Sequence, residues 1–385
     1  SSLVSVVSIP SPSSPAVAAA PPNEVAPHLP TRAEVRAVIP DHCFEISTAR
    51  SLAHLALSLV LTAIPVALAV AFLPLTWAWA PAWVLYALVT GTAAIGLWVL
   101  AHECGHGAFS RNRVLQDTVG FVLHTAMVVP YFSWQRRHAV RHAKTNHLTQ
   151  GETLVPRPRP APGTATKPGL RDRFGRGPHA VVALLKMLVL GWPAYLLFGA
   201  TGGPERGLTN HFFPHGRFES DLFPARWHRR VWASAAGVVA MHGLLVWWAF
   251  AAGSIAPVLA FYVGPVLVVN AWLVGYTWLQ HTDLDIPHYA DDDWSWLKGA
   301  FQTVDRPYGP VIDLLHHRIG STHVAHHIDH RIPHYRAREA TDAIAAAFPE
   351  WYRHDPTPVP QALWRVAGDC LGVEERPDGW YYTAD

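Results

Sequence analysis

The amino-acid sequence contains little charge and little cysteine. Asp, Glu, Lys and Arg make up only 15% of its 385 residues, whereas hydrophobic residues make up 50%. This balance is too apolar for an ordinary soluble enzyme and is typical of a protein that crosses a membrane several times. The three cysteines include no CxxC pair, so neither a disulfide framework nor a thiolate metal site is expected. The formal net charge is only +2, and no basic run interleaved with aromatic residues occurs, which argues against nucleic-acid binding.

Four long apolar stretches are each able to cross a bilayer, which takes about 20 mostly apolar residues. They run from about residue 52 to 73, 82 to 101, 231 to 252 and 257 to 279. The short linkers within each pair carry no charged residue, whereas the flanks outside the pairs carry many arginines. Because Lys and Arg mark the cytoplasmic side of a membrane, we predict two helical hairpins with both chain ends in the cytoplasm.

Eight histidines form four short clusters, and each cluster lies at or just beyond an apolar stretch. Residues three or four apart lie on one face of a helix, and neutral imidazole is the commonest metal ligand. The predicted topology puts all four clusters on the cytoplasmic side, so we expect them to assemble a metal site from distant parts of the chain. The predicted ligands are His102, His106, His138, His142, His281, His323, His326 and His327.

The number of histidines favours two metal ions. A closed zinc site needs only four ligands, whereas two ions with three to five nitrogens each would use all eight. Imidazole suits zinc, copper, iron and nickel alike, so the ligand type alone does not identify the metal.

Two further apolar stretches, 114–132 and 180–200, are interrupted by polar residues and by a Gly-Trp-Pro sequence, respectively. If either stretch crossed the bilayer alone, the later histidine clusters would lie on the side opposite the cytoplasm. We therefore predict interfacial helices there. Residues 1–30, rich in Ser, Pro and Ala, are expected to be a disordered tail, and residues 31–385 one membrane domain. The predicted fold class is an all-α integral membrane protein with a cytoplasmic histidine-rich domain.

Around the histidines the sequence resembles the membrane-bound fatty acyl desaturases, specifically the fungal-type delta-12 and omega-3 acyl-lipid group. The resemblance runs from about Leu29 to Trp380. Its blocks include His102-Glu-Cys-Gly-His-Gly-Ala-Phe-Ser110, Val129-Pro-Tyr-Phe-Ser-Trp134, Leu279-Gln-His-Thr-Asp283, Val304-Asp-Arg-Pro-Tyr-Gly309 and Gly320-Ser-Thr-His-Val-Ala-His-His327.

This resemblance implies a di-iron centre that uses O2 to remove two hydrogens from an acyl chain. The same eight histidines would then be the iron ligands. The resemblance also implies an acyl-lipid substrate and the endoplasmic reticulum membrane as the location. The sequence contains no fused haem-binding His-Pro-Gly-Gly motif, so the family's cytochrome b5-type electron donor would be a separate protein.

The second histidine cluster departs from the family pattern, which reads His-x-x-His-His. Here Arg141 stands where the family has a histidine, so eight of nine family ligand positions remain. A guanidinium stays protonated and offers no lone pair to a metal. His147 is the nearest spare histidine, but its offset of five residues from His142 points roughly away on a helix. A softer departure is Arg336, where the family usually has histidine.

Several functions stay open at this point. Delta-12 desaturation of oleoyl to linoleoyl chains is the leading hypothesis, and omega-3 desaturation of linoleate is not separated from it by the histidine clusters. A hydroxylase, acetylenase or conjugase outcome is a further option on the same fold. Arg141 supports the alternative of a catalytically inactive homologue that binds lipid or a partner in the membrane.

Other polar residues near the clusters have weaker assignments. Metal-bound histidines usually donate their second N–H to an outer acceptor. The candidate acceptors, which are equally well explained as solvated charges, are Glu103, Glu152, Asp313 and Asp329. For His316 and His317 we expect packing or lipid headgroup contact rather than metal binding.

Overall fold

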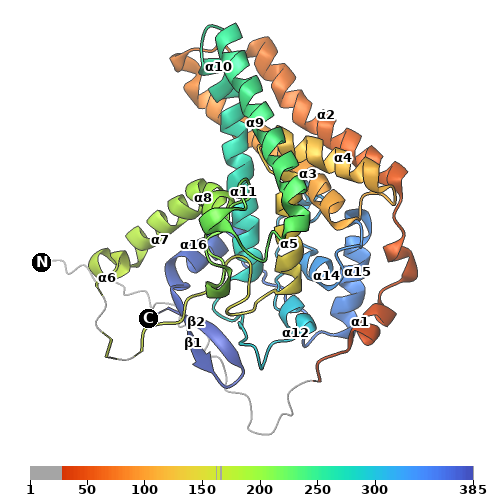
Figure 1. Ribbon diagram of the computed structural model, residues 1–385, viewed down its shortest axis with the longest axis vertical. Coiled ribbons are helices and arrows are strands. Elements are labelled where there is room, and N and C mark those ends of the chain that lie inside the picture. Colours follow the sequence, from red (N-terminus) through yellow and green to blue (C-terminus); the bar gives the residue numbers. More distant parts are fainter. Residues whose placement is uncertain (1–27, 162, 165–166, 385) are drawn as a thin grey trace, which may run out of the picture.

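Four long apolar helices dominate the upper half of the molecule (Figure 1). The computed structural model describes residues 28–161, 163–164 and 167–384; most of the predicted tail, residues 1–27, lies outside this range. The four helices are α2 (Thr48–Phe72), α3 (Ala80–His106), α9 (His228–Ala251) and α11 (Gly264–His281). The last continues α10 (Ala256–Val258) and a π-helical turn (Leu259–Val263) without a break. These helices coincide with the four predicted apolar stretches.

A fifth helical segment is also long and apolar enough to cross a membrane. This segment, Arg176–Phe198, consists of α7 (Arg176–Leu185), a π-helical turn (Lys186–Leu190) and α8 (Gly191–Phe198). Figure 1 shows it leaving the bundle sideways, at a steep angle to α9 and α11. The sequence predicts an interfacial helix here, whereas length and composition equally allow a span.

The remaining helices are shorter. The stretch 114–132 forms α4 and the start of α5, and the 14 residues of α4 are too few to cross a bilayer. The shorter helices are α1 (Arg32–Val38), α4 (Arg113–Ala126), α5 (Tyr131–Ala143), α6 (Leu170–Phe174), α12 (Trp296–Ala300), α13 (Pro310–Leu315), α14 (His323–Ile328), α15 (His334–Ala347) and α16 (Val359–Asp369). Single 3-10 turns lie at Asp41–Phe44, Trp77–Trp79, Pro204–Arg206, Gly216–Phe218 and Ala225–Trp227.

Helix α3 lies inside the bundle, and its neighbours lie outside. The apolar window of α3 is 61% buried, against 11% for α2 and 17% for α9. The outer helices therefore leave apolar side chains exposed, as a lipid environment requires. Helix α3 packs against both α2 and α11. Because no Cβ stands at Gly91, α3 approaches α11 closely at Val268 and Pro265.

A second apolar core lies below the bundle and holds the short helix α14 in place. Helices α1, α12, α14 and α15 contribute side chains to it, among them Val35, Phe301, Val324 and Ile344. The core leaves the histidine face of α14 directed toward the ends of α3 and α11.

A small β-hairpin near the C-terminus corrects the all-α prediction. Strands β1 (Gly372–Arg376) and β2 (Gly379–Thr383) pair antiparallel, with Val373 opposite Tyr382. The Pro377-Asp378-Gly379 sequence between them is a turn signal in its own right. The hairpin packs on Leu148 through the buried Val373 and Tyr382.

A buried ionic network anchors the segment that follows α11. The Arg306 side chain is fully buried and donates to Asp283 Oδ2 at 2.8 Å and also to Asp355. Arg365 on α16 donates to the same two carboxylates. Burial favours a higher pKa for Asp355, but hydrogen bonds from Thr357 and the charge of Arg306 outweigh it and hold that pKa at about 2. The network thereby ties the chain beyond α11 to the C-terminal segment.

We expect Gly91→Ala to destabilise the protein, because the new Cβ would lie 2.5 Å from Val268 Cβ and 2.6 Å from the Pro265 carbonyl oxygen. Overpacking typically costs about 1–3 kcal/mol, which outweighs the gain of about 1 kcal/mol from replacing glycine by alanine in a helix. Gly243→Ala on α9 is the control, since nothing lies within 4 Å of its Cβ. Thermal denaturation in detergent should give a lower Tm for Gly91→Ala alone; equal changes in both variants would contradict close packing at Gly91.

Candidate metal centre

Three helices bring five of the predicted histidines together. His102 and His106 lie on the last turns of α3, which Gly107 ends in the left-handed conformation at φ 79°. The other three are His138 and His142 on α5 and His326 on α14. One ring nitrogen of each lies within 4.8 Å of the others, and we call this group the five-histidine cluster.

The Nε2 atoms of this cluster face one another. The separation is 2.9 Å between His102 and His138, and 3.2 Å between His102 and His106. It is 3.1 Å both between His138 and His142 and between His142 and His326. Nitrogens about 2.0–2.1 Å from one ion lie roughly 2.9–3.4 Å apart at octahedral or tetrahedral angles. The observed separations fit a shared cation.

The other three predicted histidines form a second group, the three-histidine cluster. His281 ends α11, and His323 and His327 lie on α14, with 3.2 Å between the Nε2 atoms of His281 and His323. Thr145 Oγ1 is 3.1 Å from His327 Nδ1, which leaves the buried Nε2 of His327 without a hydrogen-bond partner. The His327 ring stacks on His142 with 4.1 Å between centroids, so the two clusters are adjacent.

Burial keeps these imidazoles neutral. It lowers the pKa of the histidines on α5 and α14 well below the usual range, to about 3 for His326. Neutral imidazole is the form that binds a metal. The arrangement is therefore compatible with a metal centre at neutral pH.

Arg141 lies beside the three-histidine cluster. It shares a small polar pocket with His281 and His288, and its charge further lowers the pKa of His323 and His327. Among the described residues, no carboxylate forms an ion pair with Arg141, because Glu152 pairs with Arg137 instead. A permanent cation with no lone pair thus lies beside the three-histidine cluster.

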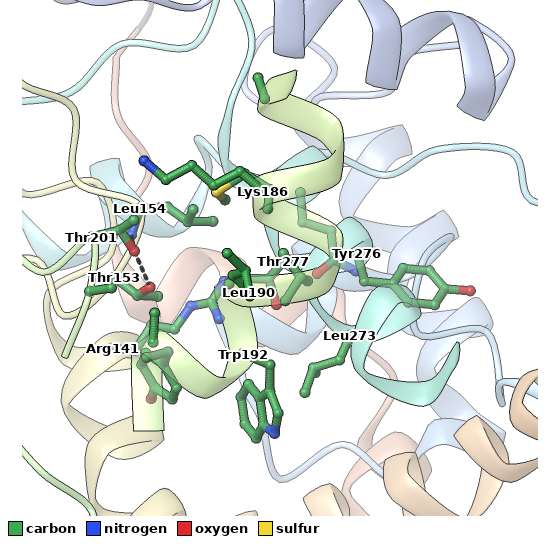
Figure 2. A pocket seen from close by; sticks show the side chains of 18 of the residues that line it. Arg141, Thr153, Leu154, Lys186, Leu190, Trp192, Thr201, Leu273, Tyr276 and Thr277 are labelled. Atoms are coloured by element: carbon green, nitrogen blue, oxygen red, sulfur yellow. Dashed lines mark hydrogen bonds between the residues drawn. The ribbon is translucent and has the colours of Figure 1, made fainter. Parts of the chain in front are cut away.

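An apolar cavity of about 780 Å³ reaches both clusters. His102 and His138 of the first cluster and His323 of the second are among its lining residues. More than half of the lining comes from α3, α11 and the segment formed by α7, the π-helical turn and α8. Figure 2 shows Arg141 directed into this cavity, among side chains that include Leu190, Trp192 and Thr277. The volume lies within the range of about 300–1,000 Å³ that is usual for small-molecule sites.

The predicted outer acceptors do not contact either cluster. Glu103 accepts hydrogen bonds from His334, Asp313 from Ser321, and Asp329 from Arg331. Glu152 pairs with Arg137. Each of the four acidic side chains thus has another donor as its partner. Within the described part of the chain, the buried Nδ1 atoms of His102, His142 and His323 have no hydrogen-bond partner.

Three histidines outside the predicted set bear on the site. His316 packs between Tyr276 and the Thr92 carbonyl, as predicted. His147 is 2.9 Å from Asp291 and is not part of either cluster, so it does not replace the missing ligand. His330 was not predicted from the sequence, and its ring centroid lies 4.7 Å from that of His106. Its position three residues after His327 was the available signal, but α14 ends before it.

Comparisons with known proteins identify the family to which the chain belongs. The sequence model of the fatty acid desaturase family matches residues 77–357. The chain is 39% identical over 350 residues to a delta(12)-oleate desaturase of Trichosanthes kirilowii, covering 90% of this chain and 92% of that one. It is 38% identical over 359 residues to a delta(12)-fatty-acid desaturase of Arabidopsis thaliana, covering 90% of each chain. It is also 39% identical over 357 residues to an oleoyl-12-hydroxylase of Ricinus communis, covering 91% of this chain and 89% of that one.

The histidine clusters, the apolar cavity beside them and these relatives lead to one conclusion: the chain is an oxidoreductase that belongs to the fatty acid desaturase family.

Proposed function

We propose that this protein is a membrane acyl-lipid desaturase of the delta-12 type, which converts oleoyl to linoleoyl chains. The observation that carries the proposal is that two adjacent histidine clusters both contribute side chains to the lining of one apolar cavity. Relatives at 38–39% identity include proteins named for delta-12 desaturation. Omega-3 desaturation of linoleate remains the alternative reaction on the same site.

The eight predicted histidines are the proposed metal ligands. The five-histidine cluster would hold one iron and the three-histidine cluster the other. Bound iron would supply the O2-dependent oxidation that an unactivated acyl chain requires. The two clusters share α14, so this short helix would set the distance between the ions.

The apolar cavity is the proposed acyl site. Trp98, Leu273 and Leu190 give it walls that exclude water and fix the chain by shape. His102 and His138, which line the cavity, would place the metals beside one stretch of methylenes. The depth of the cavity would then select the carbons that react.

We further propose that the protein crosses the endoplasmic reticulum membrane as two hairpins, α2–α3 and α9–α11, with α7 and α8 in the interface. The exposed apolar faces of α2 and α9 support contact with lipid. Both clusters and both chain ends would then face the cytoplasm, where a cytochrome b5-type protein would deliver electrons.

Arg141 would weaken the three-histidine site. Three imidazoles and a nearby guanidinium bind a cation less well than four nitrogens, because the guanidinium adds repulsion and no lone pair. This feature also favours the second candidate function, a membrane homologue that binds lipid without catalysis.

We expect Arg141→His to raise linoleate production about tenfold or more, because it supplies a nitrogen to the three-histidine cluster. The host should make oleate but no polyunsaturated fatty acids. Gas chromatography–mass spectrometry would measure linoleate and locate the double bond. Arg111→His, the same exchange at an exposed position, is the matched control.

Each outcome decides between the candidates. Equal linoleate from the unmodified chain and Arg141→His would contradict impairment by Arg141. A new omega-3 double bond in supplied linoleate would replace the delta-12 assignment. No product from either protein, with both present in the membrane, would support the non-catalytic function.

The iron content of the purified protein should also depend on Arg141. We expect about one tightly held iron per unmodified chain and about two per Arg141→His chain, because only the five-histidine cluster is complete without the exchange. Mass spectrometric metal analysis would measure both, with His242→Ala on α9 as the control. The same iron content in both proteins would contradict an unequal pair of sites.

A further inference from the structure

A third group of histidines lies outside both clusters. It comprises His54 on α2, His317 in the loop after α13, and His334 at the start of α15. One ring nitrogen of each lies within 4.8 Å of the others. The ring centroid of His334 is 4.4 Å from that of His54 and 4.5 Å from that of His317. Side chains from three distant parts of the sequence therefore converge at one point.

Hydrogen bonds occupy one nitrogen in each of two of these rings. His334 Nδ1–H donates to Glu103 Oε2 at 2.7 Å, and its buried Nε2 has no partner among the described residues. His317 Nε2 lies 2.9 Å from Ser58 Oγ, so its Nδ1 is the nitrogen that a cation would use. A carboxylate that fixes one ring nitrogen and leaves the other for a cation is the usual support of a metal-bound histidine.

Arg50 on α2 places one positive charge near His54, whereas the arginines that line the adjoining cavity are paired with carboxylates. The three rings line a cavity of about 590 Å³ that also contains Arg306, Arg318 and Arg338. Each of these arginines has a carboxylate partner. Arg306 pairs with Asp283 and Asp355, Arg318 with Asp313, and Arg338 with Asp342. The guanidinium charges are thus largely compensated, while nitrogen lone pairs of the imidazoles remain.

We infer that His54, His317 and His334 form a third metal site that takes a divalent zinc-type cation. Three neutral imidazoles with a fourth position open to a cavity are an established zinc set. Tetrahedral ligation would require the nitrogens, now within 4.8 Å of one another, to move to roughly 3.3 Å apart. The His54 side chain is only partly buried.

The bound ion would join α2 to α15 and to the loop before α14. Through Glu103 the site also contacts the end of α3, next to His102. It shares no residue with the five-histidine or the three-histidine cluster. Its role would therefore be to hold the first membrane helix against the histidine-rich domain, whatever reaction that domain performs.

Cobalt binding tests this inference directly. Co²⁺ would be titrated into the iron-loaded full-length protein in detergent, and its visible d–d absorption would report tetrahedral nitrogen ligation. We expect His54→Phe and His317→Ala to lower the cobalt affinity about tenfold or more. The phenylalanine keeps the aromatic packing of His54 beside Tyr335 and His334. His242→Ala is the control, because His242 contacts only the Val238 carbonyl of its own helix through a hydrogen bond.

The iron content, measured in parallel, separates this site from the two proposed iron sites. Loss of tetrahedral cobalt in His54→Phe with unchanged iron would support the third site. Cobalt at the three-histidine cluster would contribute equally to the unmodified protein and to both variants. Cobalt absorption that is as strong in both variants as in the unmodified protein, or that appears only as iron is displaced, would therefore overturn the third site. A variant that elutes as aggregate would be replaced by Ser58→Ala, which removes only the support of His317 and should weaken cobalt binding more mildly.

Discussion

The structure depends on packing eight neutral imidazoles into one buried space. Nε2 atoms about 3 Å apart direct several lone pairs at the same points, and neutral rings with one N–H each do not satisfy all of these contacts. A cation is the group that would resolve this arrangement. The surrounding elements therefore act to hold the four helix segments carrying these rings in fixed positions.

Two kinds of packing provide that rigidity. In the apolar bundle, the close approach of α3 to α11 at Gly91 aligns the two helices that end at His106 and His281. Below the bundle, the apolar core around Phe301 and Val324 orients α14, whose six residues supply histidines to both clusters. The buried Arg306 network holds the chain just beyond His281. The membrane part and the polar part thus position the same site from two sides.

The two clusters are chemically unequal. Five nitrogens surround one point, whereas three surround the other and Arg141 lies beside them. The relatives at 38–39% identity include proteins named for oleate desaturation and hydroxylation. Because the guanidinium adds a positive charge and no lone pair, the proposed effect of Arg141 is on the smaller cluster.

The sequence by itself determined the four long apolar helices and the pairing of histidines within a helix, because both depend only on local spacing and composition. It also showed that position 141 is an arginine, whose guanidinium offers no lone pair to a metal. Only the tertiary structure decided that His326 joins α3 and α5 while His323 and His327 join α11, since neighbours on one helix face can turn to different partners. Only the tertiary structure also decided that Glu103, which lies beside His102 in sequence, accepts a hydrogen bond from His334. It likewise brought His54 next to His317 and His334, which are distant in sequence. Long-range packing sets these contacts, and no local pattern encodes them.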